Sequence, residues 1–107
     1  MPIEVKRLSY KSAAGVHFPD AVINTEEYYA IDFNELIDVE SETVTGVEWE
    51  TPDAITVLDS YINTEFNEAH VKLKPIKAGI YKITCVLTSV DTGRTQKPRK
   101  EVILRVD

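Results

Sequence analysis

The sequence predicts an all-β protein that folds as an antiparallel β-sandwich, on three observations. From Glu27 onward, apolar residues alternate with polar ones, which is the spacing of a strand that buries one face. Turn-forming residues interrupt this pattern at short intervals, and no segment shows helical spacing of comparable strength. The chain has 107 residues, enough for one hydrophobic core, so we expect residues 1–107 to form a single domain.

Five amphipathic strands are expected between residues 27 and 107, with Ile55–Leu58 as a short sixth strand. In each strand, a row of apolar residues should face the core while polar residues face outward. The expected core rows are Tyr29, Ile31 and Phe33; Val47 and Trp49; Val71 and Leu73; Tyr81, Ile83, Cys85 and Leu87; and Val102, Leu104 and Val106. Breaks between strands are expected at Thr51–Asp53, Pro75, Ala78–Gly79 and Asp91–Gly93.

The first 26 residues lack a continuous alternating pattern. Ile3 and Val5 could form an edge strand, and His17–Asp20 has the composition of a turn. Two interpretations stay open for this segment: it completes the sandwich, or it is an arm that becomes ordered on a neighbouring molecule. We favour the first, because arms usually contain fewer apolar residues than this segment does.

The single cysteine, Cys85, cannot form an internal disulfide, so the packing of the core alone should stabilise the fold. Its place inside an expected strand predicts a buried side chain that acts as a small hydrophobe. The chain begins with no apolar run that would indicate a secretory signal, and no stretch has the roughly eighteen apolar residues of a membrane helix. We therefore expect no export and no membrane partner.

Charge is segregated along the chain. The net charge is −6, yet residues 20–68 hold fourteen acidic residues and no lysine or arginine. All twelve basic residues therefore lie in the two flanks, together with the four remaining acidic ones. Nonspecific nucleic-acid binding needs a basic face that replaces counterions, so nucleic acid is not expected to be the main partner.

One tripeptide, Asp91-Thr92-Gly93, matches the signature of aspartic proteases. The same residues between two amphipathic strands are typical of a hairpin turn in which Gly93 supplies positive φ. Arg94 follows where a protease would have a small apolar residue, and the paired carboxylates would have to come from a dimer. We favour the turn. The sequence holds no Ser/His/Asp set or phosphate-binding loop, so we expect no enzyme, cofactor or small-molecule substrate.

Metal sites are not expected either. His17 and His70 are the only histidines, and neither has a cysteine or a pair of carboxylates at ligand spacing. The alternating acids Asp38, Glu40 and Glu42 lack the turn glycine and the distal glutamate of a calcium loop. A solvated loop is the better interpretation of these acids.

Trp49 on an early strand and Cys85 on a late one, with Ala78–Tyr81 just before the latter, resemble strands C and F of immunoglobulin-like domains. This resemblance implies that the tryptophan packs against the cysteine and that Tyr81 bonds back to the main chain. Cys85 has no cysteine partner on another strand. The expected fold is therefore an immunoglobulin-like sandwich without the disulfide.

At finer grain, residues 27–107 resemble a family of short virion proteins of tailed bacteriophages, the fibre-to-tail adaptors and related structural proteins. The motifs that carry the resemblance are Tyr29–Phe33 with Leu36-Ile37, Thr43–Trp49 followed by Pro52 and Ile55–Val57, Ala78–Cys85, and Thr92–Thr95 before a final alternating strand. The resemblance implies a protein that binds other virion proteins in the tail, neck or fibre-attachment region. Such a protein would be assembled in the host cytoplasm and remain in the virion.

Two sets of residues are candidates for contact with partners. Val86 and Ile103 are apolar residues on the nominal outer faces of adjacent strands. The basic group Arg94, Lys97, Arg99 and Lys100 surrounds Pro98; it could contact nucleic acid or an acidic partner, or it could keep a sheet edge from pairing. Contact between the acidic and basic parts of neighbouring copies would give a head-to-tail ring.

A carbohydrate- or surface-binding module is the alternative function. Such a module would display exposed aromatic side chains near one cluster of loops. The candidates in this sequence are Tyr28, Tyr61 and Phe66.

Overall fold

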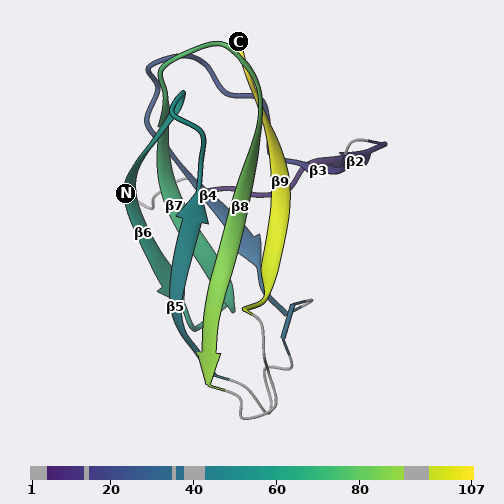
Figure 1. Cartoon of the computed structure of the whole chain (residues 1–107), viewed down its shortest axis with the longest axis vertical. Helices are drawn as coiled ribbons and strands as arrows, with labels where there is room; N and C mark the ends of the chain where they lie inside the picture. Colours follow the sequence, from purple (N-terminus) through teal and green to yellow (C-terminus); the bar gives the residue numbers. More distant parts are fainter. Residues whose placement is uncertain (1–4, 14, 35, 38–42, 91–96) are drawn as a thin grey trace.

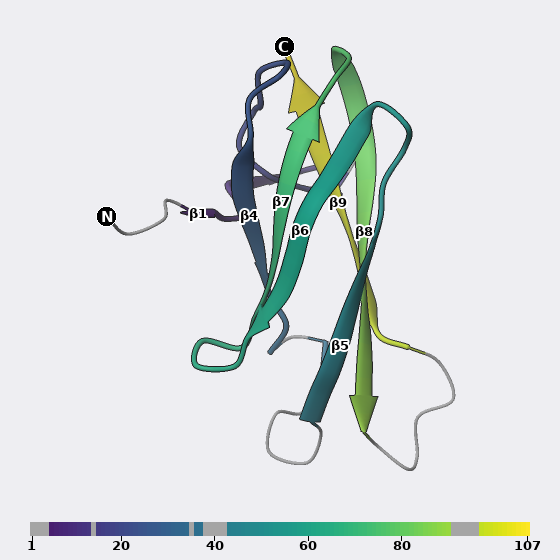
Figure 2. The same ribbon diagram turned by 90° about the vertical axis from the view of Figure 1, so that its left-hand side faces the viewer.

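The computed structural model shows two β-sheets packed face to face, so the predicted all-β sandwich is confirmed (Figures 1 and 2). The structure describes residues 5–13, 15–34, 36–37, 43–90 and 97–107. Within these ranges there is no helix long and apolar enough to cross a membrane. The described residues form nine strands: β1 (Val5–Lys6), β2 (Tyr10–Ser12), β3 (Gly15–His17), β4 (Glu27–Asp32), β5 (Thr43–Glu50), β6 (Ile55–Asn63), β7 (Glu68–Pro75), β8 (Gly79–Val90) and β9 (Arg99–Val106).

One sheet has four strands in the order β1-β4-β7-β6, and the other has five in the order β2-β3-β9-β8-β5. The strands that carry the core rows pair antiparallel, as expected for an immunoglobulin-like sandwich. Cys85 is a free, fully buried cysteine, so the expectation of a fold without a disulfide holds.

Between the sheets lies a core of side chains from both layers. Most of the expected rows are there: Tyr29, Ile31, Phe33, Val71, Leu73, Ile83, Cys85, Leu87, Val102, Leu104 and Val106 are all at most 3% exposed. Three other expected members, Val47, Trp49 and Tyr81, are only partly buried and pack against this cluster. The period-two alternation therefore identified the inward faces correctly.

Two features of immunoglobulin-like domains are present. Trp49 on β5 lies directly opposite Cys85 on β8 in the antiparallel register. The hydroxyl of Tyr81 donates to the main-chain oxygens of Ala78, at 2.8 Å, and Lys77, at 3.0 Å. The hydroxyl thus fixes the turn that leads from β7 into β8.

The N-terminal segment contributes to both sheets. Strand β1 joins the four-stranded sheet beside β4, and β3 joins the five-stranded sheet beside β9. Both pairings are parallel, unlike those of the strands that carry the core rows, because the segment crosses from one layer to the other. Phe18, expected in a turn, is fully buried and packs against Tyr29 with ring centroids 4.9 Å apart. The β2–β3 hairpin projects from the body of the sandwich (Figure 1).

Strand β6 is longer than the sequence predicts. It continues past Leu58 to Asn63 and pairs with β7 along its length. A β-bulge between Val57 and Asp59 shifts the register, which explains why a simple alternation breaks off there.

Candidate partner-binding groove

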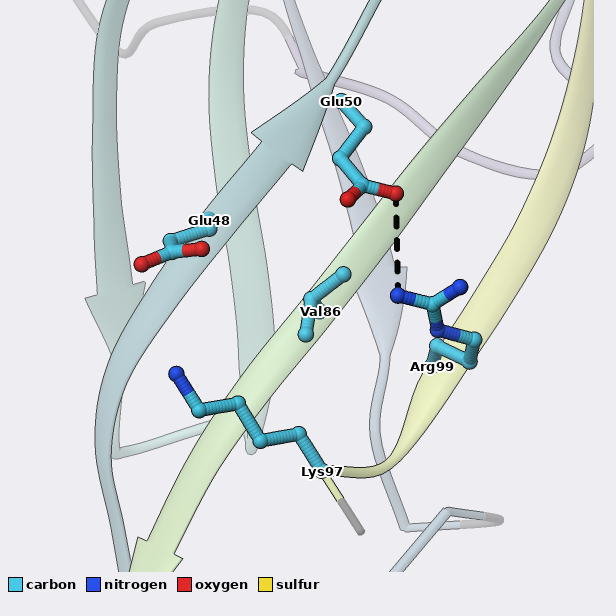
Figure 3. Close-up of a pocket in the computed structure, with 5 residues that line it drawn as sticks. All are labelled: Glu48, Glu50, Val86, Lys97 and Arg99. Atoms are coloured by element: carbon cyan, nitrogen blue, oxygen red, sulfur yellow. Dashed lines mark ion pairs between the residues drawn. The ribbon is translucent and has the colours of Figure 1, made fainter.

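A groove of about 520 Å³ lies on the outer face of the five-stranded sheet. Three neighbouring strands form it, because Glu48 on β5 lies opposite Val86 on β8, and Val86 lies opposite Arg99 on β9. Its lining residues are Glu48, Glu50, Val86, Lys97 and Arg99 (Figure 3).

The alternation of the strands places these side chains outward. Trp49 and Cys85 face the core, so their neighbours Glu48 and Val86 face the other side of the sheet. The start of β9 is held against β8 by a hydrogen bond from the Leu87 amide to the Pro98 oxygen, 2.8 Å long. This contact places the residues on either side of Pro98 at the rim of the groove.

The two ends of the groove differ in charge pairing. Arg99 and Glu50 form an ion pair of 3.7 Å, in which both side chains are more than half exposed. Such a pair stabilises a fold by about 1 kcal/mol at most. Within the part of the chain that the structure describes, neither Glu48 nor Lys97 forms an ion pair. Figure 3 shows these two side chains apart from the pair, with Val86 between.

The floor of the groove is apolar. Val86 is only 4% exposed, although it lies on the outer face of the sheet and lines the groove together with four charged side chains. An apolar centre with a polar rim is the usual composition of a protein–protein interface. The groove thus presents a carboxylate and an ammonium group that form no ion pair among the described residues, on either side of a nearly covered valine.

The structure brings together three of the residues predicted to contact partners, namely Val86, Lys97 and Arg99. Ile103 does not join them: it is 8% exposed, and its Cδ1 atom lies 3.6 Å from the position of a Cβ on Gly15 of the hairpin. The chain's own N-terminal segment covers this residue.

Lys100 lies on β9 opposite Cys85 and does not line the groove. Arg94 is outside the described residues, as are the tripeptide that begins at Asp91 and the acids Asp38, Glu40 and Glu42. Binding of a partner by any of the predicted contact residues stays a prediction.

Sequence reasoning did not identify Glu48 and Glu50 as candidates, although it placed them outward. The available signal was their position on β5 on either side of Trp49, which places them on the same face as Val86 when Trp49 lies opposite Cys85. Finding it requires the pairing of β5 with β8, which the sequence alone does not establish.

A second polar cluster lies on the outer face of the four-stranded sheet. The Tyr61 hydroxyl donates to His70 Nδ1 at 3.1 Å, and His70 Nε2 donates to a Glu68 oxygen at 3.2 Å. Arg7 donates to both Glu68 oxygens, at 2.7 and 3.0 Å. His70 and Glu68 are almost fully buried, at 3% and 6% exposed. Hydrogen bonds from Arg7 lower the pKa of Glu68, although burial acts in the opposite direction.

Next to this cluster are two of the three aromatic residues proposed for carbohydrate binding. The rings of Tyr28 and Tyr61 meet edge to face at 6.2 Å, and Tyr61 also stacks on His70 at 4.8 Å. The hydroxyl of Tyr28 donates to Asp59 at 3.2 Å. The third candidate, Phe66, lies in the turn after β6 and is 59% exposed.

Neither histidine lies in a metal-binding group. Among the residues that the structure describes, no three His, Cys, Asp or Glu side chains gather closely enough to hold a metal ion. His17 instead stacks on Tyr10 in the projecting hairpin, with ring centroids 4.2 Å apart.

Comparisons with known proteins give the fold only. No protein-family model and no curated protein sequence matches the chain. Among solved structures, a cysteine protease inhibitor, EhICP2, from Entamoeba histolytica is similar, with a TM-score of 0.52, 14% identity and coverage of 82% of each chain. Amebosin is a weaker match, with a TM-score of 0.39, 10% identity, and coverage of 83% of this chain and 87% of that one.

Proposed function

We propose that the chain is a structural or adaptor protein of a bacteriophage virion and acts by protein–protein assembly in the tail, neck or fibre-attachment region. It would bind other virion proteins, assemble in the host cytoplasm and perform no catalysis. The resemblance of residues 27–107 to virion adaptors and the groove on the five-stranded sheet support this role.

The observation that carries the proposal is the presence of Glu48 and Lys97 in one groove, beside the apolar floor of Val86. Arg99 and Glu50, only a few residues away, do pair. Opposite charges that form no ion pair with any described residue, beside an apolar centre, suit a partner that supplies the matching charges, and such charges set specificity and orientation.

The groove is also where the segregated charges of the sequence meet. Glu48 belongs to the acidic stretch of residues 20–68, and Lys97 belongs to the basic C-terminal flank. A neighbouring copy or another virion protein with complementary charges could bind across this boundary. Repeated head-to-tail contacts of one kind would close into a ring.

A pull-down from infected cells, with the tagged chain as bait, tests the proposal. The unaltered chain should retain tail, neck or fibre proteins, identified by mass spectrometry, while Glu48→Lys and Lys97→Glu should each lose them. Lys11→Glu is the matched control: it reverses an exposed charge on the hairpin, outside the groove, and should retain the same proteins. Equal retention by all four chains would exclude the groove as the binding surface.

Self-assembly needs a separate measurement. Size-exclusion chromatography with light scattering, over a series of salt concentrations, should show oligomers at low salt that dissociate as salt screens the charges. A chain that stays monomeric at high protein concentration and low salt would exclude the ring.

A carbohydrate-binding module is the second candidate, because Tyr28 and Tyr61 lie together on the outer face of the four-stranded sheet. A glycan array tests it. Binding of defined saccharides that Tyr61→Ala abolishes and Glu48→Lys leaves intact would favour this function over assembly through the groove.

A further inference from the structure

Strand β6 forms one edge of the four-stranded sheet (Figure 2). Among the described residues it pairs with β7 alone, so the backbone groups on its other side have no partner strand. An edge of this kind is a template on which another extended chain can pair.

Proteins usually protect a long edge strand with lysine, proline or a short length. Strand β6 has nine residues, contains neither lysine nor proline, and has Asp59 as its single charged residue. Residues 56–61 are all exposed. The bulge between Val57 and Asp59 is a partial protection, but the ladder beyond it runs regularly from Asp59 to Asn63.

The core is incompletely covered at this edge. Val57 lies opposite Leu73 and shares its inward face, yet Val57 is 38% exposed while Leu73 is fully buried. The next residue, Leu58, is 44% exposed. By contrast, β5, the corresponding edge of the five-stranded sheet, carries none of the large exposed apolar side chains found in the described part of the chain.

The charge around the edge indicates which kind of strand would cover it. Asp59 lies on β6 and Glu65 lies in the turn that follows, within the stretch of residues 20–68 that has no lysine or arginine. Two copies of β6 that paired antiparallel would bring these acids together, which is unfavourable. A basic partner strand would instead place cations on the free side of these acids, across from Lys72, which lies opposite Asp59 on β7.

We propose that the free edge of β6 binds an extended segment of a partner protein, by β-strand addition, and that the segment alternates apolar and basic residues. In an added strand, side chains alternate between the two faces of the sheet. The apolar ones would continue the inward face and cover Val57, and the basic ones would continue the outward face beside Asp59. This surface is separate from the groove, so it can exist whether or not the groove binds a virion protein.

Three nine-residue peptides test the proposal by titration into the ¹⁵N-labelled full chain. One alternates lysine and valine, one alternates lysine and proline, and one alternates glutamate and valine. The lysine–valine peptide should shift the amide resonances of residues 55–63. The lysine–proline peptide keeps the charge but loses alternate N–H donors, and the glutamate–valine peptide keeps the strand but reverses the charge; neither should bind there.

Two variants confirm where the peptide binds. Leu58→Lys adds a positive charge at the edge and should weaken the binding of the lysine–valine peptide by at least about tenfold. Thr45→Lys adds the same charge to the edge of β5 and should leave the affinity unchanged. If the lysine–proline peptide binds as tightly as the lysine–valine peptide, charge attraction alone explains the binding and no strand is added. If the lysine–valine peptide does not bind, the proposed partner chemistry is excluded. A dimer that Leu58→Lys dissociates would show instead that a second copy occupies the edge.

Discussion

The phenol oxygen of Tyr81 lies 2.9 Å from the position that a Cβ atom on Gly79 would occupy. Gly79 also has φ of +149°, a region that residues with a side chain rarely adopt. Because the Tyr81 hydroxyl is held by two main-chain oxygens, it cannot move away without losing those hydrogen bonds. The turn that starts β8 thus depends on glycine at this position.

Gly79→Ala should therefore lower the free energy of unfolding by about 1–3 kcal/mol, measured by urea denaturation. Gly46→Ala is the control, since an added Cβ there would meet Thr88 at an ordinary 3.7 Å, and it should be close to neutral. In a Tyr81→Phe background, Gly79→Ala should cost less, because the clash with the oxygen is gone. Equal costs for the two glycine substitutions would contradict this account of the turn.

Removal of the Arg7 side chain should destabilise the fold, because the buried Glu68 carboxylate loses two hydrogen bonds. Arg7→Met leaves Glu68 with His70 as its remaining side-chain partner among the described residues and should destabilise the fold at pH 7 by about 1–3 kcal/mol. Lys82→Met, which breaks the exposed pair with Glu101, should change stability far less.

The effect of Arg7→Met should also depend on pH. Because the pKa of Glu68 is lowered from 4.5 in the folded state, its ion pair stabilises the fold above that pH, and this contribution is lost as the pH falls through the lowered pKa. Urea denaturation of both chains at several pH values should show the difference narrowing below about pH 4.5. If the difference in unfolding free energy between the two chains stays constant down to strongly acidic pH, this explanation is wrong.

Trp49 offers a test of an unsatisfied donor. Its indole nitrogen is buried and has no hydrogen-bond partner among the residues that the structure describes. Trp49→Phe removes that donor and keeps a ring, so we expect the free energy of unfolding to change by less than about 1 kcal/mol. Trp49→Ala should cost about 3 kcal/mol through the lost packing. If Trp49→Phe is as unstable as Trp49→Ala, the loss of the indole N–H is itself costly, so this nitrogen has a hydrogen-bond partner in solution.

Cys85 should be unreactive in the folded protein. Burial raises the pKa of its thiol to about 12, so almost no thiolate exists near neutral pH. A thiol reagent at pH 8 should modify Cys85 only when denaturant is added. Because the unfolded thiol ionises at a lower pH than the folded one, this group should also reduce stability as the pH rises above about 9. Cys85→Val should lose that part of the alkaline destabilisation.

The inward faces of the sandwich were predictable because each depends on a local signal. Tyr29 and Ile31 are two positions apart on one strand, as are Ile83 and Cys85 on another, and period two is sufficient to assign them. Phe18 shows the limit of this reasoning. It is a lone aromatic before a proline, and only the crossing of the N-terminal segment between the sheets makes it part of the core.

The polar cluster and the groove were predictable only in part, because both depend on partners distant in sequence. As a polar residue beside Val71, His70 lies on the outward face, yet it bonds to Tyr61 and Glu68 and is only 3% exposed. In the same way, Ile103 was expected on the surface until the hairpin that covers it was known. Alternation determines which face a side chain takes, whereas the order of strands determines what covers that face.

The pairing of the N-terminal segment with the C-terminal strand β9 affects how quickly the molecule folds. The amides of Phe18 and Ala21 bond to the oxygens of Ile103 and Arg105, and the Asp107 amide bonds back to Ala21. Closing a sheet between segments so far apart requires most of the chain to be brought together first, which is characteristic of β-proteins that fold in milliseconds to seconds. During synthesis, β3 can pair with β2, but it cannot join the five-stranded sheet until β9 has left the ribosome.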